Sequence, residues 1–104
     1  MARKQWQNRD ERWRAFLDHV VESPAHLPTD VRASILEGSA VPPGLEPLVS
    51  TVRRHAYRVT DGEILTARDA GFTEDEIFDA IVVAACAEAE RRRRAVQRVV
   101  DDSR

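Results

Sequence analysis

The chain has very little cysteine. Cys86 is the single cysteine among 104 residues, which excludes an intrachain disulfide, a C-x-x-C redox pair and a zinc site built on the cysteines of one chain. The three histidines, His19, His26 and His55, are not spaced one helical turn apart, as a metal-binding pair on one helix would be. We therefore expect no bound metal and no cofactor.

Long apolar runs are also missing. The longest, Ile81 to Ala87, is far shorter than the roughly 20 residues of a membrane-spanning helix. The N-terminus has no apolar signal core, so we expect no membrane contact and a cytoplasmic location. The chain also has no large excess of positive or of negative charge. The net charge is only −2, which does not indicate a strong nucleic-acid surface.

The remaining composition, 42% apolar and 33% charged, is typical of a soluble globular protein. A chain of 104 residues suffices for a single domain, 1–104, with one modest core. We expect residues 1–8 to be flexible.

No segment shows the two-residue alternation of a half-buried strand, whereas apolar residues recur at helical spacing throughout. The sequence therefore predicts an all-α fold, a compact bundle of about five helices with a long C-terminal helix. The expected helices run from Arg9 to Glu22, Asp30 to Glu37, Leu45 to Val59, Thr60 to Gly71 and Glu74 to Val100. Their expected buried stripes are Trp13, Phe16, Leu17, Val20 and Val21; Val31, Ile35 and Leu36; Leu45, Leu48, Val49, Val52, Ala56 and Val59; and Ile77, Phe78, Ile81, Val82, Ala85 and Ala89.

Two threonines mark helix starts. Thr60 and Thr73 each precede a glutamate by three residues, the pattern of a capping box. At the second helix we expect Thr29 to cap the start and Gly38 to close the end.

The middle of the last helix, VVAACAEA, is small and apolar on nearly every side. A lone domain of this size rarely covers the whole circumference of a helix. We therefore predict a homo-oligomer, with Ile81, Ala84, Ala85 and Ala87 at the interface. An unidentified protein partner is also possible on this pattern.

The segment 55–78 has the two helices and glycine turn of a helix-turn-helix. Its second helix, however, begins with Glu74, Asp75 and Glu76, which would face DNA phosphates. Nucleic-acid binding is therefore not expected. The run Arg91 to Arg94 does not reverse this, because four consecutive helical residues point in four directions. We expect Glu88 to bridge to Arg92, and Glu90 to Arg94, as i, i+4 pairs.

The segment DAGFTEDEIFDAIVVAACAEA and the helix before it resemble the alkylhydroperoxidase D-like and carboxymuconolactone decarboxylase-like superfamily over residues 45–95. Peroxidases of that family carry C-x-x-C-x-x-x-H ahead of the Ala-Gly. Ala56 and Val59 stand at the two cysteine positions here, and Glu63 at the histidine position. The chain thus looks like a short subset of the family without the redox cysteines. We expect no thiol peroxidase activity, and Cys86 as a buried packing residue.

Three classes of function follow. The favoured one is a non-redox binding or assembly module that keeps the family's helical frame. The alternative is a small enzyme of carboxymuconolactone decarboxylase type acting on a small carboxylate. Its catalytic candidates are His55, Arg58 and Glu63, where the resemblance places the redox site. A helix-turn-helix DNA binder is the second alternative. The enzyme hypothesis requires that its three candidates meet in one pocket.

Overall fold

The computed structural model describes residues 2–55 and 58–103, and their side chains from residue 8 onward. Its five helices are α1 (Ala2–Glu22), α2 (Thr29–Glu37), α3 (Glu46–His55), α4 (Asp61–Asp69) and α5 (Glu74–Asp102). The described part contains no strand. The all-α class and the long C-terminal helix are therefore confirmed.

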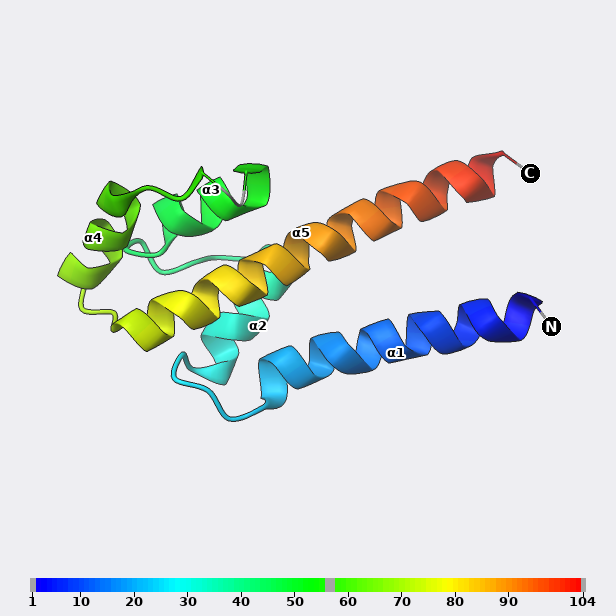
Figure 1. The fold of residues 1–104 in the computed structure, drawn as a ribbon, viewed down its shortest axis with the longest axis horizontal. Helices are drawn as coiled ribbons and strands as arrows, with labels where there is room; N and C mark the ends of the chain where they lie inside the picture. Colours follow the sequence, from blue (N-terminus) through cyan, green and yellow to red (C-terminus); the bar gives the residue numbers. More distant parts are fainter. Residues whose placement is uncertain (1, 56–57, 104) are drawn as a thin grey trace.

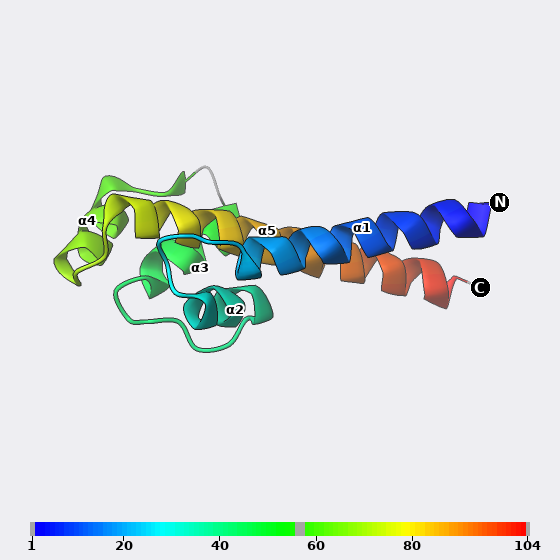
Figure 2. The same ribbon diagram turned by 90° about the horizontal axis from the view of Figure 1, so that it is seen from below.

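Helix α5 runs the length of the molecule, with α3 and α4 along its N-terminal half (Figure 1). Most of its contacts are with α2 and α3. Helix α1 and the C-terminal half of α5 extend to the same end of the molecule, beyond the other three helices, as both views show (Figures 1 and 2). The bundle is thus a compact body with two long helices leading away from it.

The core lies where α5 meets α2 and α3. Eleven buried apolar residues form one cluster, as expected for a domain with a single core. They are Leu27, Ile35, Leu45, Leu48, Val49, Val52, Ala67, Ile77, Ala80, Val83 and Ala84.

Five expected core residues lie at the surface instead: Phe16 of α1 and, on α5, Phe78, Val82, Ala85 and Ala89. Phe16 of α1 is 47% exposed and Phe78 of α5 is 65% exposed. Phe16 stacks on Trp13, with their ring centroids 5.6 Å apart. In both helices the apolar stripe is wider than the face that the rest of the chain covers. The prediction that these side chains are buried was wrong for that reason.

Two of the four capping predictions are confirmed in full, at Thr73 and Gly38, and the one at Thr60 is confirmed in part. The side chain of Thr60 accepts a hydrogen bond from the Glu63 backbone N–H, and Thr73 and Glu76 form a complete capping box. The capping box at Thr60 is incomplete, because the Glu63 carboxylate bonds to the Thr60 hydroxyl (3.2 Å) rather than to its backbone N–H. Gly38 closes α2 with a left-handed φ of 77°, a conformation that suits glycine.

The predicted cap at Thr29 was wrong. The N-cap of α2 is Pro28, and Thr29 Oγ1 instead accepts a hydrogen bond from Arg32 Nη2 (3.1 Å). Helix boundaries also differ. Helix α1 begins at Ala2 rather than Arg9, and α3 ends at His55. The predicted core position Ala56 lies outside the described residues.

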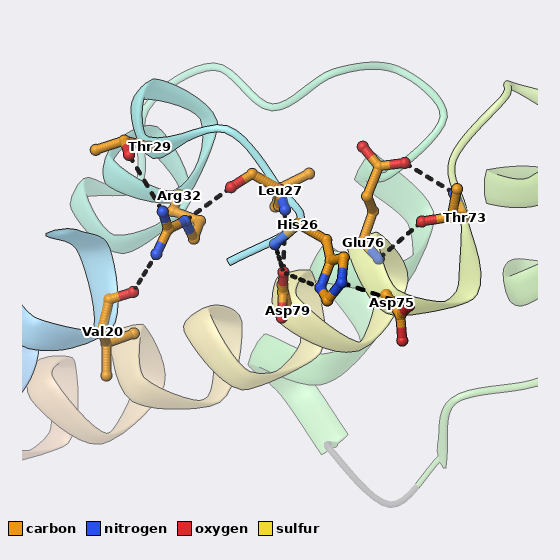
Figure 3. A network of polar contacts seen from close by, with 9 residues as sticks. All are labelled: Val20, His26, Leu27, Thr29, Arg32, Thr73, Asp75, Glu76 and Asp79. Carbon is orange, nitrogen blue, oxygen red and sulfur yellow. Dashed lines mark hydrogen bonds and ion pairs between the residues drawn. The ribbon is translucent and has the colours of Figure 1, made fainter. Parts of the chain in front are cut away.

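A buried arginine holds the connection between α1 and α2 (Figure 3). Arg32 is 3% exposed and donates to the carbonyl oxygens of Val20 (2.8 Å) and Leu27 (2.9 Å). Val20 lies in the last turn of α1, where carbonyl groups lack helical partners and the helix dipole is negative. Arg32 of α2 thus supplies a hydrogen-bond donor to a carbonyl group at the C-terminal end of α1.

The carboxylate of Asp79 ties the same connection to α5 (Figure 3). Asp79 Oδ2 accepts hydrogen bonds from the backbone N–H groups of His26 (2.8 Å) and Leu27 (3.0 Å). Their N–H groups have no helical partner, and a charged acceptor makes a strong hydrogen bond. Together, Arg32 and Asp79 set how α1 approaches the body.

Candidate functional site

The three catalytic candidates line one pocket beside the α3–α4 connection. His55, Arg58 and Glu63, with Thr51 and Arg54, surround a volume of about 350 Å³. The end of α3 supplies His55, and the first turn of α4 supplies Glu63. The condition set by the sequence, that these side chains meet in a single pocket, is therefore satisfied.

Glu63 gives this pocket an unusual polar atom. Its Oε1 interacts with the Thr60 hydroxyl, whereas Oε2 is buried without a hydrogen-bond partner in the described part of the chain. A buried, unsatisfied carboxylate oxygen costs free energy and is suited to accepting a proton or a donor from a ligand. Arg54 and Arg58 are suited to holding an anion.

The pocket has a limited chemical repertoire. Its lining consists of threonine, arginine, histidine and glutamate side chains, whereas most small-molecule sites are largely apolar with a few polar groups. The described lining is therefore suited to a short polar anion.

The outer face of α5 is a second candidate surface. Its exposed apolar and small residues follow helical spacing at i, i+4, i+7, i+11, i+18 and i+22, so they form one stripe. We call it the outer stripe of α5, and it consists of Phe78, Val82, Ala85, Ala89, Val96 and Val100.

The four residues predicted to form the interface differ in how far the chain itself buries them. Ala85 is exposed on the outer stripe, and Ile81 is half-buried against the core cluster. Ala84 is fully buried in the core of its own chain, so its methyl group is not available to a second subunit. Ala87 is half-buried and lines a cleft on the opposite side of α5. Of the four, Ala85 is the one exposed to solvent.

The arginine run behaves as its spacing predicts. Glu88 accepts from Arg92 (3.0 Å), and Glu90 from Arg94 (2.8 Å), which confirms both i, i+4 pairs. Arg91 also bonds to Glu88 through two nitrogens, at 2.7 and 2.9 Å. The hydrogen bond from Arg91, reinforced by Arg92, lowers the pKa of Glu88 to about 2.

Glu90 joins α5 to α1 in a way that the spacing did not show. It is a buried carboxylate that accepts from Trp13 Nε1 of α1 and from Arg93 and Arg94. The hydrogen bond from Arg93, with those from Trp13 and Arg94, lowers the pKa of Glu90 to about 2. Arg93 also reaches Asp10 of α1 at 3.4 Å. These contacts hold the two long helices together.

The surface at the start of α5 carries acidic side chains. Arg68 pairs with Glu74 at 3.1 Å, and the His26 imidazole lies 3.6 Å from Asp75 (Figure 3). The helix that would enter a DNA groove thus begins with three carboxylates, which repel phosphates. No feature of this surface favours the helix-turn-helix hypothesis.

The environment of Cys86 disfavours thiol chemistry. Cys86 is half-buried, and burial raises the pKa of its thiol, which disfavours the reactive thiolate. Val59 packs against the core cluster. Ala56, at the other family cysteine position, lies outside the described residues.

Neither a metal-ligating cluster nor a membrane-spanning helix occurs among the described residues. No group of three or more metal-ligating side chains comes together there. No helix among them is both long enough and apolar enough to cross a membrane. Searches of protein-family models, curated proteins and solved structures found no match to the chain.

Proposed function

We propose that this protein is a non-redox helical assembly module that pairs with a second copy of itself through the outer stripe of α5. The observation that carries the proposal is the exposure of large apolar side chains on one helix face. Phe78 is 65% exposed and Val96 is 63% exposed. Exposed large apolar side chains gathered on one helix face mark interaction sites in soluble proteins.

The order of residues along the stripe favours an antiparallel pair of α5 helices. Ala85 and Ala89 lie near its middle and permit close approach, while Phe78 and Val96 lie toward opposite ends. A twofold axis between Ala85 and Ala89 would place Phe78 of one copy opposite Val96 of the other, as an isologous contact requires.

Sedimentation equilibrium at micromolar concentration tests this assembly. The wild-type chain should self-associate, and Phe78→Glu should weaken association at least about thirtyfold, because a buried unpaired charge costs about 2 kcal/mol or more. Leu65→Glu is the matched control, since Leu65 is similarly exposed (57%) but lies on α4. A monomeric wild type, or equal weakening by Leu65→Glu, would contradict the proposal.

A second candidate is the small enzyme of carboxymuconolactone decarboxylase type, with His55, Arg58 and Glu63 acting on a short carboxylate. The observation favouring it is that all three side chains line one pocket. Binding of a short carboxylate is the first requirement of this hypothesis. Arg54 would hold the anion beside Arg58, and Glu63 would exchange a proton with it.

Titration with succinate, followed by NMR, tests this second candidate. Arg54→Gln should weaken succinate binding about fivefold or more, because one charged donor is lost. Glu63→Gln should strengthen it, because a like charge is removed. Arg68→Gln, on α4 but outside the pocket lining, should leave binding unchanged. Absence of binding at millimolar succinate would rule the hypothesis out.

A further inference from the structure

A larger cleft lies on the side of α5 opposite the outer stripe. It has a volume of about 600 Å³ and is lined by side chains from α1, α2, α3 and α5. Helices α1 and α5 run to the same end of the molecule (Figure 1). Pockets of this size hold small organic molecules.

The α5 wall of the cleft comes from one helix face. Ala87, Arg91, Arg94 and Arg98 line it, and their spacing of i, i+4, i+7 and i+11 places them on one side of the helix. The four consecutive arginines do not all lie on one helix face. Two of them, Arg91 and Arg94, form a patch with Arg98. That spacing was readable in the sequence.

The other elements add both charge and apolar surface. Arg14 comes from α1 and Arg53 from α3, facing the same cleft as the arginines of α5. Leu17 and Leu36 join Ala87 as its apolar lining. An arginine-rich cleft with apolar lining combines the two features that bind an amphipathic anion.

The cleft lining carries five arginines and four carboxylates, so one positive charge remains in excess. Glu88 is held by Arg91 and Arg92, and Glu90 by Arg93 and Arg94. Both glutamates are thus already paired, each with two arginines. The remaining lining carboxylates, Asp18 and Glu37, make no ion pair in the described part of the chain.

Several guanidinium groups retain unused donors. Arg14 and Arg98 make no hydrogen bond or ion pair with any described residue. Arg94 uses only Nε, toward Glu90, and Arg53 uses one Nη, toward the Ile35 carbonyl (3.0 Å). Guanidinium groups without a carboxylate partner are available for bidentate contact with a ligand.

We infer that this cleft binds a small organic anion with an apolar body, its carboxylate held by Arg14 and Arg98 and its chain lying against Leu17, Leu36 and Ala87. This site is separate from the outer stripe and from the pocket of His55, Arg58 and Glu63. It depends on neither proposed function.

Titration of the ¹⁵N-labelled full chain with octanoate, below its micelle-forming concentration, tests the inference. Amide resonances of residues 14–18 and 87–98 should shift, with a dissociation constant below about 1 mM. Octanol, which lacks the charge, and inorganic phosphate, which lacks the apolar body, should each bind at least about tenfold more weakly. Shifts centred on Phe78 and Val82 or on Thr51 and Glu63, or equally tight binding of octanol or phosphate, would overturn it.

A pair of double variants separates a specific site from general charge. Arg14→Gln with Arg98→Gln should weaken octanoate binding at least about tenfold. Arg12→Gln with Arg68→Gln removes the same amount of charge outside the cleft lining, and should change binding less than twofold. Circular dichroism verifies that both variants are folded. Equal weakening by the two pairs would overturn the inference.

Discussion

Ala84→Glu is expected to leave the chain largely unfolded at room temperature. Ala84 is fully buried inside the core cluster, so glutamate would place a charge among apolar side chains with no partner and no space. Burial of an unpaired charge and overpacking together cost more than about 4 kcal/mol, which approaches the whole stability of a small domain. Loss of the helical circular dichroism signal, or a collapsed urea midpoint, measures the effect.

The neighbouring substitution is the control. Ala85 lies one residue later on the same helix and is exposed on the outer stripe. Ala85→Glu should therefore keep a urea midpoint close to that of the wild type, and lower only self-association. If Ala84→Glu were as stable as Ala85→Glu, the assignment of Ala84 to the core of its own chain would be wrong.

Arg32→Met is expected to destabilise the fold by about 3–5 kcal/mol. Methionine replaces the arginine stem, but leaves the carbonyl oxygens of Val20 and Leu27 without the guanidinium that now bonds to them. Each unsatisfied buried acceptor costs about 1–3 kcal/mol. The favourable interaction of a cation with the C-terminal end of α1 is lost as well. Urea unfolding followed by circular dichroism gives the free energy of unfolding.

Two further variants identify the cause. Arg32→Lys keeps the charge but lacks the planar group that reaches several acceptors, so it should lose part of this stability. Thr29→Val removes only the exposed hydroxyl acceptor and should cost less than about 1 kcal/mol. A wild-type free energy of unfolding for Arg32→Met would show that the network does not stabilise the fold.

Local interactions explain why much of the fold was predictable. Thr73 and Glu76 cap α5 within one turn, and Glu88 meets Arg92 one turn later in the same helix. Such contacts depend on residues three or four apart, and therefore follow from sequence spacing. The positions of α2, α4 and α5 were accordingly found to within a few residues. The start of α1 was missed because the segment before Arg9 has no capping signal.

The candidate sites were predictable only in part. His55 and Glu63 are close in sequence, on either side of a short connection, so their meeting in one pocket could be anticipated. The family resemblance that suggested them rests on residue pattern alone. Arg14, Arg53 and Arg98 are far apart in sequence and share a cleft only because three helices pack around it.

By itself the sequence determined the helical class, most helix ends and the ion pairs within α5, because these depend on neighbours along the chain. Tertiary packing alone decided which side of α5 is buried. Ala84 and Ala85 are equivalent in local sequence, yet one is enclosed by its own chain and the other is exposed. The same packing buried Arg32, which donates to the carbonyl oxygen of Val20 in the last turn of α1. Burial depends on how distant segments fit together. Where a helix is apolar on nearly every side, spacing along it does not show which side the rest of the chain covers.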